Sequence, residues 1–358
     1  MIEKGKIWKF SGVILIVYVI IAGLLIPLKS GIESVEPSYG NAGETLKIQV
    51  TGYNTHFKEA GNSLRAWLKW DNGKAIAASE MVALDERRMN LTFSIPNNLP
   101  ENTEVQAVTL LIDSETDGTS VLPSAIFLTQ TEKVLATEEV PWVKPEDFSN
   151  NGQITFPFRN ILGETIRNTY FHVPLWFGMM FLFLFAVIHS IKYLRKGDAE
   201  SDLKAEAYTQ TGIFYGLLGL ITGALWAKNT WGAYWSWDIK QNMTVVALLI
   251  YAAYFILRAS FEDPEKRARV CAAYGIFAFS TLIPLLYVIP RLTDSLHPGS
   301  GGNPAFGSQD LDNTMRMVFY PAVIGFTLFG FWLSSLQFRY LRLQKLKYFK
   351  IFLGSDLR

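Results

Sequence analysis

Four of the ten tryptophans lie within thirteen residues of the chain, from Trp226 to Asp238, between two long apolar runs. Tryptophan is common where a membrane meets water, because its ring is apolar while its N–H still needs a partner. One or two tryptophans would be typical of such a belt. Four of them beside Lys228 and Lys240 favour instead a flat shelf, rimmed by cations, that stacks a planar anionic ligand. We call these four residues the tryptophan shelf: Trp226, Trp231, Trp235 and Trp237.

Asp238, at the end of this stretch, has two interpretations. It is followed by Ile239, Lys240 and Gln241. An aspartate with a glutamine three residues later is typical of a helix N-cap with a capping box. The sequence therefore predicts that Asp238 begins the next helix, while a role for its carboxylate at a ligand site stays open.

Two of the four histidines, His172 and His297, flank apolar runs on either side of the shelf. A single histidine at a helix end is more often a hydrogen-bonded interface residue than a ligand. Two neutral imidazoles, however, can ligate haem iron from opposite faces, and haem is flat and largely apolar. A structural zinc site usually takes four ligands and gives no reason for the tryptophans. The pattern therefore predicts haem held by His172 and His297 against the shelf.

Nearby cations fit the same interpretation. Haem carries two propionates, and charge-assisted hydrogen bonds from lysine or arginine would hold them. The candidate cations are Lys228, Lys240, Arg291 and Arg316.

The composition indicates the kind of protein that must position these residues. Of 358 residues, 49% are hydrophobic, 14% aromatic and only 18% charged, which is typical of a polytopic membrane protein. The net charge of +1 gives no reason to expect a nucleic-acid partner. The single cysteine, Cys271, excludes an intrachain disulfide and a Cys-x-x-Cys pair, so the chain is not itself a c-type cytochrome.

Six uncharged apolar runs approach the ~20 residues that a spanning helix needs. The first follows three lysines and has no Ala-x-Ala cleavage site after it, so we expect an uncleaved transmembrane helix within residues 1–30. The runs are Ser11–Leu28, His172–Ile191, Tyr208–Ala227, Gln241–Leu257, Val270–Pro290 and Met317–Phe338.

Clusters of lysine and arginine predict the orientation of these spans. They precede the first run, follow the second, separate the fourth from the fifth, and follow the last, so six spans place them all on one side. By the positive-inside rule both termini are then cytoplasmic, and the shelf, His172, His297 and the loop 291–316 lie outside. His189 lies about 25 Å deeper than His172 along the same helix and cannot share a metal with the outer pair.

Residues 31–140 are different in kind and predict a β-sandwich outside the membrane. Short alternating segments separated by Gly, Asn, Asp and Pro are typical of half-buried strands joined by turns. Several strands at this spacing favour an immunoglobulin-like domain of about a hundred residues, on which His56 is a surface residue. The clearest segments are residues 45–50, 64–70, 91–95 and 105–112.

Together these patterns predict an α-helical polytopic membrane protein with about six transmembrane helices and an inserted all-β extracytoplasmic domain. In chain order we expect a first transmembrane helix in 1–30, the β-sandwich in 31–140, a tether in 141–168, a membrane domain in 169–343 and a cytoplasmic tail in 344–358.

The tryptophan stretch also carries a family resemblance. It resembles the WWD motif of the haem-handling proteins of cytochrome c maturation, and residues 172–343 resemble CcmC. His172 and His297 match the two outer histidines that hold haem in that family. The resemblance implies haem b, transiently bound at the outer face of the bacterial inner membrane and delivered to the haem chaperone CcmE without catalysis. The matching motif residues are Trp226, Trp231, Gly232, Trp235, Trp237 and Asp238.

The resemblance further implies three partners that release the loaded chaperone: the ABC-transporter subunits CcmA and CcmB, and the small membrane protein CcmD. Two features depart from the family pattern. The loop between the first two spans is short in the family but carries the β-domain here, and the loop 297–316 is rich in glycine. Both features bear on the contact with the chaperone more than on the haem site.

Two other functions fit part of the sequence. A CcsA-type cytochrome c synthetase shares the WWD motif and attaches haem to apocytochrome. Such proteins usually have more spans and further histidines inside the membrane, whereas His189 stands alone here. A membrane anchor that displays the β-domain would explain that domain but not the clustering of the shelf with the outer histidines.

Overall fold

A computed structural model describes residues 7–101, 103–130, 140–150, 152–297 and 311–355. The chain divides into a helical unit, Met1–Leu25 with Thr165–Arg358, and a β unit, Ile26–Glu164. Each unit has a hydrophobic core of its own.

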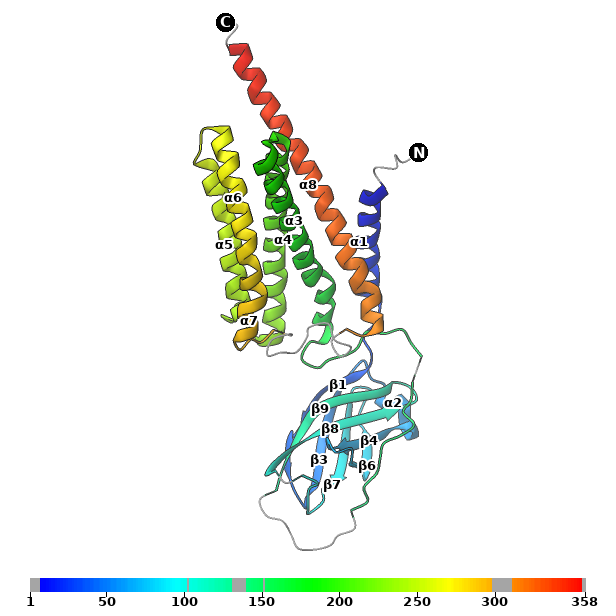
Figure 1. The fold of residues 1–358 in the computed structure, drawn as a ribbon. Helices are drawn as coiled ribbons and strands as arrows, with labels where there is room; N and C mark the ends of the chain where they lie inside the picture. Colours follow the sequence, from blue (N-terminus) through cyan, green and yellow to red (C-terminus); the bar gives the residue numbers. More distant parts are fainter. Residues whose placement is uncertain (1–6, 102, 131–139, 151, 298–310, 356–358) are drawn as a thin grey trace. The chain divides into compact units, whose positions relative to one another are not determined.

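Six helices in the described part of the helical unit are long and apolar enough to cross a membrane (Figure 1). An α-helix satisfies its own backbone groups, which is what a segment in hydrocarbon requires. This confirms the predicted α-helical membrane protein with about six spans. A π-helical turn at Pro284–Val288 and the short α7 (Ile289–Leu292) extend the fifth span. The long helices are α1 (Ile7–Leu25), α3 (Thr169–Lys196), α4 (Ala199–Trp231), α5 (Ile239–Ala259), α6 (Pro264–Ile283) and α8 (Asn313–Ser355).

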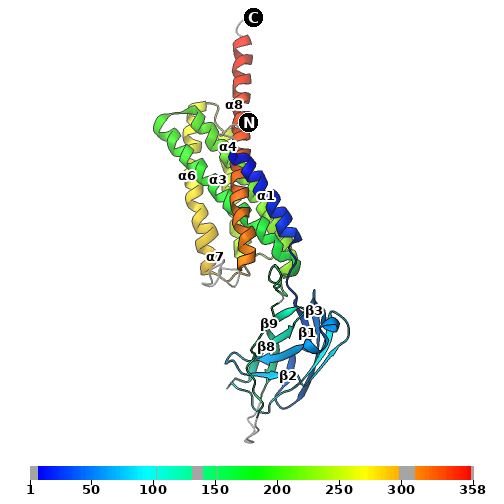
Figure 2. The ribbon, with the colours of Figure 1, turned by 90° about the vertical axis from the view of Figure 1, so that its right-hand side faces the viewer.

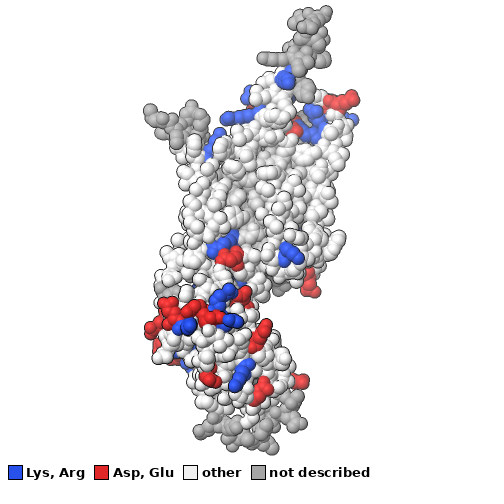
Figure 3. Space-filling view, turned by 180° about the vertical axis from the view of Figure 1, so that it is seen from behind, with Lys and Arg blue, Asp and Glu red and all other residues white. Residues whose placement is uncertain are grey.

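Charged side chains of the helical unit gather towards its ends, and its middle is apolar (Figure 3). At the end where α1 begins and α8 ends, Arg258 of α5 donates to both carboxylate oxygens of Asp202 at 2.8 and 2.7 Å. Arg258 also lies 2.7 Å from Glu206, and the three side chains are largely buried. We call this end the charged end and the opposite end the site end.

Helices α3 and α4 pack closely because glycines on α4 leave room for large side chains of α3. A Cβ added at Gly219 or Gly223 would lie only 2.7 Å from the ring that fills the space. Small residues at such spacing allow helices in a membrane to approach each other. The pairs are Gly212 with Phe183, Gly216 with Met179, Gly219 with Trp176 and Gly223 with His172.

Helix α1 packs along α8, and the two lie side by side in both views (Figure 2). A Cβ at Gly325 would lie 2.9 Å from the Leu15 Cβ, so this glycine permits the close approach. The Tyr18 hydroxyl donates to the Met317 carbonyl at 3.1 Å near the site end. The first span is therefore part of the helical unit.

The β unit contains two sheets, of four and five strands. The first has the order β1-β3-β7-β6, with β1 (Gly31–Glu36), β3 (Thr45–Tyr53), β7 (Arg88–Ser94) and β6 (Glu80–Ala83). The second has the order β2-β9-β8-β4-β5, with β2 (Tyr39–Asn41), β9 (Gly118–Thr129), β8 (Val105–Ser114), β4 (Arg65–Lys69) and β5 (Ala75–Ala77). A one-turn helix, α2 (Phe57–Ala60), follows β3.

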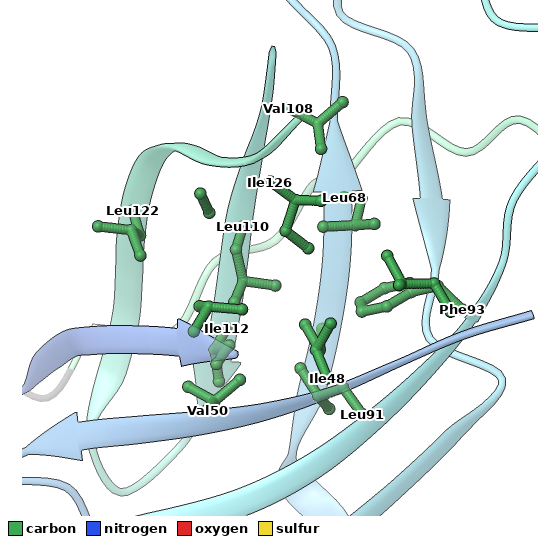
Figure 4. Packing of buried hydrophobic residues seen from close by; sticks show 14 of the residues in the cluster. Ile48, Val50, Leu68, Leu91, Phe93, Val108, Leu110, Ile112, Leu122 and Ile126 are labelled. Atoms are coloured by element: carbon green, nitrogen blue, oxygen red, sulfur yellow. The ribbon is translucent and has the colours of Figure 1, made fainter. Parts of the chain in front are cut away.

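Alternating residues of both sheets form the core of the β unit (Figure 4). β3 alternates buried and exposed residues over most of its length, as expected for a strand with one face on a core. Each of the four predicted segments falls on a strand, which confirms the inserted all-β domain. Central members of the core include Ile48, Val50, Leu68, Leu91, Phe93 and Leu110.

Residues 140–162 cover the last residue of the predicted β-sandwich and most of the predicted tether, 141–168. In their described part they pack against the sheets of the β unit, and we call them the strap. Val143 exchanges backbone hydrogen bonds with Ala75, at 2.9 and 3.1 Å, beside the edge strand β5. The Phe156 carbonyl accepts from the Lys29 N–H at 2.7 Å, and the Phe156 side chain is fully buried. The Pro-rich composition of the strap indicated a linker, but these contacts hold it in place.

Asp113 of β8 binds the strap from inside the β unit. One carboxylate oxygen accepts from the Thr119 hydroxyl at 2.6 Å and from the Ser149 N–H at 2.9 Å. The other accepts from Arg65 at 2.6 Å and from the Ser149 hydroxyl at 3.0 Å. Burial alone would raise the pKa of Asp113, but these hydrogen bonds hold the pKa below its usual value.

Candidate functional site

The loop that carries the tryptophan motif is short because each adjoining helix has a definite end. α4 ends at Gly232, whose φ of 80° lies in the left-handed region that glycine adopts without strain. α5 begins at Asp238, whose carboxylate accepts from the Lys240 N–H at 2.9 Å, as the N-cap interpretation predicted. The predicted capping box does not form, because the Gln241 side chain accepts from the Ser236 N–H at 2.9 Å instead.

Asp238 also binds His297, which follows α7 and is the last residue of the described range 152–297. The His297 ring nitrogen Nδ1 is 2.8 Å from a carboxylate oxygen of Asp238. The Leu296 N–H donates to the same carboxylate at 2.8 Å, and the Ser295 hydroxyl at 3.2 Å. Because an ionised carboxylate only accepts, Nδ1 of His297 carries the proton and Nε2 of the neutral ring keeps its lone pair. The N-cap and the ligand-site interpretations of Asp238 therefore describe the same carboxylate.

The electrostatics of this pair keep the imidazole ready to bind a metal. Burial alone would raise the pKa of Asp238, but the Leu296 N–H, the charge that His297 carries when protonated at low pH, and the Ser295 hydroxyl hold this pKa below its usual value. Burial lowers the pKa of His297 even though Asp238 lies beside it. At neutral pH His297 is therefore neutral, the form in which imidazole binds metals.

His172, in the first turn of α3, also has a defined tautomer. The indole N–H of Trp176 lies 3.2 Å from its Nε2, and indole is a donor only, so this nitrogen accepts. The proton is then on Nδ1, which donates to the Thr222 hydroxyl of α4 at 3.0 Å. The Thr222 hydroxyl in turn donates to the Leu218 carbonyl at 2.9 Å. Both histidines thus carry their proton on Nδ1 and present Nε2 as the basic nitrogen.

Two members of the tryptophan shelf lie beside the imidazoles, and the other two lie beside each other. The Trp231 ring is 4.8 Å from the His297 ring, and the Trp226 ring is 5.8 Å from the His172 ring, centroid to centroid. Trp235 and Trp237 meet edge to face at 6.3 Å. Trp237 has a positive φ of 59° and its side chain is 78% exposed. The buried N–H of Trp226 has no hydrogen-bond partner in the described part of the chain.

These residues converge at the site end of the helical unit, where α3 begins, α4 ends, α5 begins and α7 ends (Figure 1). His172 contacts Trp226 and His297 contacts Trp231, and both tryptophans lie in the last turns of α4, so the two imidazoles from distant segments lie against the same helix end. All eight residues that the sequence singled out lie at this end, but contacts join only some of them. His172 contacts Trp226, and His297 contacts Trp231 and Asp238. Trp235 and Trp237 contact each other, and Lys228 contacts the end of α4.

The predicted cations lie at the same end in different settings. The Lys228 ammonium donates to the Gly232 carbonyl at 2.9 Å and lies over the Tyr234 ring, so in this structure it caps α4. Arg291 of α7 is exposed. Lys240 and Arg316 begin α5 and α8 and are half-buried. Lys228 and Arg291 are therefore the two exposed cations of the four, and Lys228 already donates to the end of α4.

Three residues of the site were not singled out from the sequence: Trp176, Thr222 and Ser295. Trp176 lies four residues after His172, so helical spacing could have placed the two side chains on one face. The glycines at 219 and 223 of α4 are spaced as in close-packed membrane helices and could have indicated the contact with α3. Nothing in the sequence pairs Thr222 with His172, because that contact depends on how two helices pack.

The other two histidines lie elsewhere, as predicted. His189 stacks on Tyr208 at 5.6 Å, well along α3 from the site end. His56 lies in the β unit with its ring 2.8 Å from Asp117, whose hydrogen bond raises the pKa of His56.

The family model described as CcmC, heme exporter protein C, matches residues 152–348, more than half of the chain. The chain belongs to the CcmC family. Residues 31–140, whose described part contains strands β1 to β9, lie outside this match.

Curated relatives agree with the assignment. Heme exporter protein C of Paracoccus denitrificans is 28% identical over 170 residues, which cover 46% of this chain and 68% of the relative. Its counterpart in Bradyrhizobium diazoefficiens is 28% identical over 46% of this chain and 62% of the relative. The Escherichia coli K12 protein is 25% identical over 49% of this chain and 70% of the relative. CcmC membership confirms a haem-handling membrane protein of cytochrome c biogenesis and disfavours both alternatives.

Proposed function

We propose that the site end binds one haem b between His172 and His297, transiently and outside the membrane, and delivers it to a haem chaperone of the CcmE kind. Haem is cargo here, and its iron can accept one neutral imidazole on each face. One observation carries the proposal. Two imidazoles from distant segments contact tryptophans at the same end of α4, and each is held in the tautomer that leaves Nε2 basic.

The shelf supports the same cargo. Trp237 exposes most of its ring to solvent, and Trp226 has a buried N–H without a partner in the described part of the chain. A large exposed aromatic ring indicates a surface that another molecule covers. A flat, apolar molecule with carboxylates at its edge could cover Trp237, with Arg291 as an exposed cation for a propionate.

The proposal includes the orientation and the partners. Both termini are cytoplasmic and the site end is extracytoplasmic, because the lysine and arginine clusters belong inside. ABC-transporter subunits of the CcmA and CcmB kinds and a small CcmD-like protein would act with this chain to release the loaded chaperone. The chain itself catalyses no covalent step.

The acceptor of the haem tests this function. The haem-loaded protein in nanodiscs is mixed with a CcmE-like chaperone or with an apocytochrome carrying Cys-x-x-Cys-His, and haem on each acceptor is measured after separation. We expect transfer to the chaperone, and loss of transfer when both Trp235 and Trp237 are changed to Ala. Haem attached covalently to the apocytochrome, with none on the chaperone, would assign the chain to the synthetases instead.

A further inference from the structure

The two histidines differ in what holds them. His297 donates through Nδ1 to the carboxylate of Asp238 at 2.8 Å. A metal would bind Nε2, so this hydrogen bond would stay intact when the metal binds. His172 donates through Nδ1 to a neutral hydroxyl, Thr222, and its Nε2 already accepts from the Trp176 indole N–H at 3.2 Å. One imidazole is thus supported for metal binding, and the other has its ligating nitrogen occupied by the protein.

Building on the proposed haem site, we infer that His297 is the lasting ligand of the haem iron and His172 the exchangeable one. The Trp176 indole N–H is the group that competes with iron for Nε2 of His172. This residue belongs to neither the tryptophan shelf nor the WWD motif, and it acts on haem only through His172.

The hydrogen bond from Asp238 strengthens His297 as a ligand. A carboxylate that accepts from the far nitrogen of a ligating histidine fixes its orientation and raises its basicity. The Leu296 N–H and the Ser295 hydroxyl hold the carboxylate in turn, so the support extends into the backbone of the loop. A neutral hydroxyl gives His172 less of this effect.

Trp176 makes the departure of His172 from iron less costly. Nε2 has one lone pair, so it cannot bind iron and accept from the indole at the same time. Without the indole, a released imidazole at a half-buried helix end would be left with an unsatisfied nitrogen. Trp176 stands one helical turn after His172 and satisfies that nitrogen from the same helix.

The packing of α3 on α4 maintains this pair. The His172 ring rests on Gly223 and the Trp176 ring on Gly219, each at a position where a Cβ would lie 2.7 Å away. The rings meet nearly edge to face at 81°. The competing donor is therefore built into the helix contact and does not depend on a mobile loop.

Haem loss measures this competition directly. The full chain in nanodiscs is loaded with haem, an excess of apomyoglobin is added as a general haem acceptor, and the rate of haem transfer is followed by absorption. Trp176→Phe should slow the loss by about two- to tenfold, the range that corresponds to the net free energy of one hydrogen bond. The matched control is Trp332→Phe, which removes an indole that packs on Phe329 of α8 and should keep the parental rate.

Two further variants separate the ligands. His172→Ala should retain five-coordinate haem through His297, whereas His297→Ala should lose most of its haem. Asp238→Asn should speed haem loss, since the amide supports His297 less. Benzothienylalanine at position 176 keeps the ring shape and removes only the N–H, and it serves if Trp176→Phe does not fold; it too should slow the loss.

The outcomes distinguish this inference from the proposed function. A wild-type protein that holds no haem, or holds it without a low-spin spectrum, would contradict the proposed site itself. If the wild type binds haem but the Trp176 variants lose haem at the wild-type rate or faster, the inferred competition between Trp176 and iron for Nε2 of His172 is wrong. Retention by His297→Ala that equals or exceeds retention by His172→Ala would overturn the order of the ligands.

Discussion

The β unit and the site end of the helical unit use buried carboxylates in different ways. Asp113 in the β unit is fully buried, and Thr119, Ser149 and Arg65 donate to both its oxygens. Asp238 at the site end also has several donors. One of them is the Nδ1–H of His297, and the other ring nitrogen of His297, Nε2, is not used by Asp238. The first network is complete within the chain and joins the strap to a sheet. The second leads to a group that can bind something else.

The charged end of the helical unit resembles the β unit in this respect. Arg258 binds Asp202 through two hydrogen bonds and also contacts Glu206, so the cluster joins α4 to α5. Buried polar groups are usually satisfied, and those that are not indicate a role for an absent molecule. Function is therefore expected at the site end, where the network leaves the basic nitrogen of His297 beside the tryptophan shelf.

The largest effect on stability is expected at the charged end. Arg258→Ala leaves two buried carboxylates without their cation, which should destabilise the helical unit by about 3–5 kcal/mol. Thermal unfolding of the purified protein in detergent measures this. The control is Arg269→Ala, because Arg269 pairs with Glu265 on an exposed helix face. An equal loss of stability in both variants would show that the Arg258 cluster is not a completed structural network.

In the β unit, Asp113→Asn should free the strap and leave haem binding unchanged. This substitution removes the negative charge that pairs with Arg65 and one hydrogen-bond acceptor, so the free energy of unfolding should fall by about 1.5–3 kcal/mol. Because the folded pKa of Asp113 is below its unfolded value of about 3.9, its stabilisation is present above that value and lost as the pH falls through the folded pKa. The hydrogen-exchange protection factors of residues 140–150, which correct for the pH dependence of intrinsic exchange, should stay high from pH 7 to about pH 4 and fall below it. Low protection at pH 7 in the wild type would contradict the anchoring of the strap by Asp113.

At the site end, Gly223→Ala should displace His172 without touching the shelf. The new Cβ would lie 2.7 Å from the imidazole, and overpacking of this kind costs about 1–3 kcal/mol. We expect a smaller fraction of low-spin haem in the absorption spectrum. Gly275→Ala is the control, because a Cβ there meets its nearest neighbour, Ser190, at an ordinary 3.5 Å.

The smallest effect is expected for single changes in the shelf. Trp235→Phe or Trp237→Phe keeps an aromatic ring, so haem retention should weaken by only about 0.5–1.5 kcal/mol. The double change to Ala should lower the haem-to-protein ratio many-fold, while the haem that remains keeps its two-histidine spectrum. If the double variant keeps the haem-to-protein ratio of the wild type, the tryptophans form only an aromatic belt at the membrane interface and do not hold haem.

Patterns that repeat along the chain were predictable from the sequence. Uncharged runs predicted the six spans, because hydrocarbon imposes one length on all of them. Alternation predicted strands such as residues 45–50, since one face of a strand packs on a core. The N-cap at Asp238 was also predictable, because capping depends on neighbours within one turn.

Contacts between distant segments were not predictable in the same way. Asp238 and His297 meet because α7 ends beside the start of α5, and no local pattern records that. Trp176 was missed because a tryptophan in an apolar helix is ordinary until its N–H is seen to reach a histidine. The strap was predicted as part of a tether from its prolines and polar residues, and no local pattern records that Phe156 pairs with the distant segment at Leu28 and Lys29.

The absorption spectrum of the purified protein, with and without each outer histidine, tests the central claim most directly. The wild type should carry haem with a six-coordinate, low-spin spectrum that indicates two imidazole ligands. His172→Ala should give a five-coordinate spectrum, and His297→Ala a protein with little haem, while His189→Ala should match the wild type because that residue lies far along α3. An unchanged low-spin spectrum in both outer variants would contradict haem binding between His172 and His297.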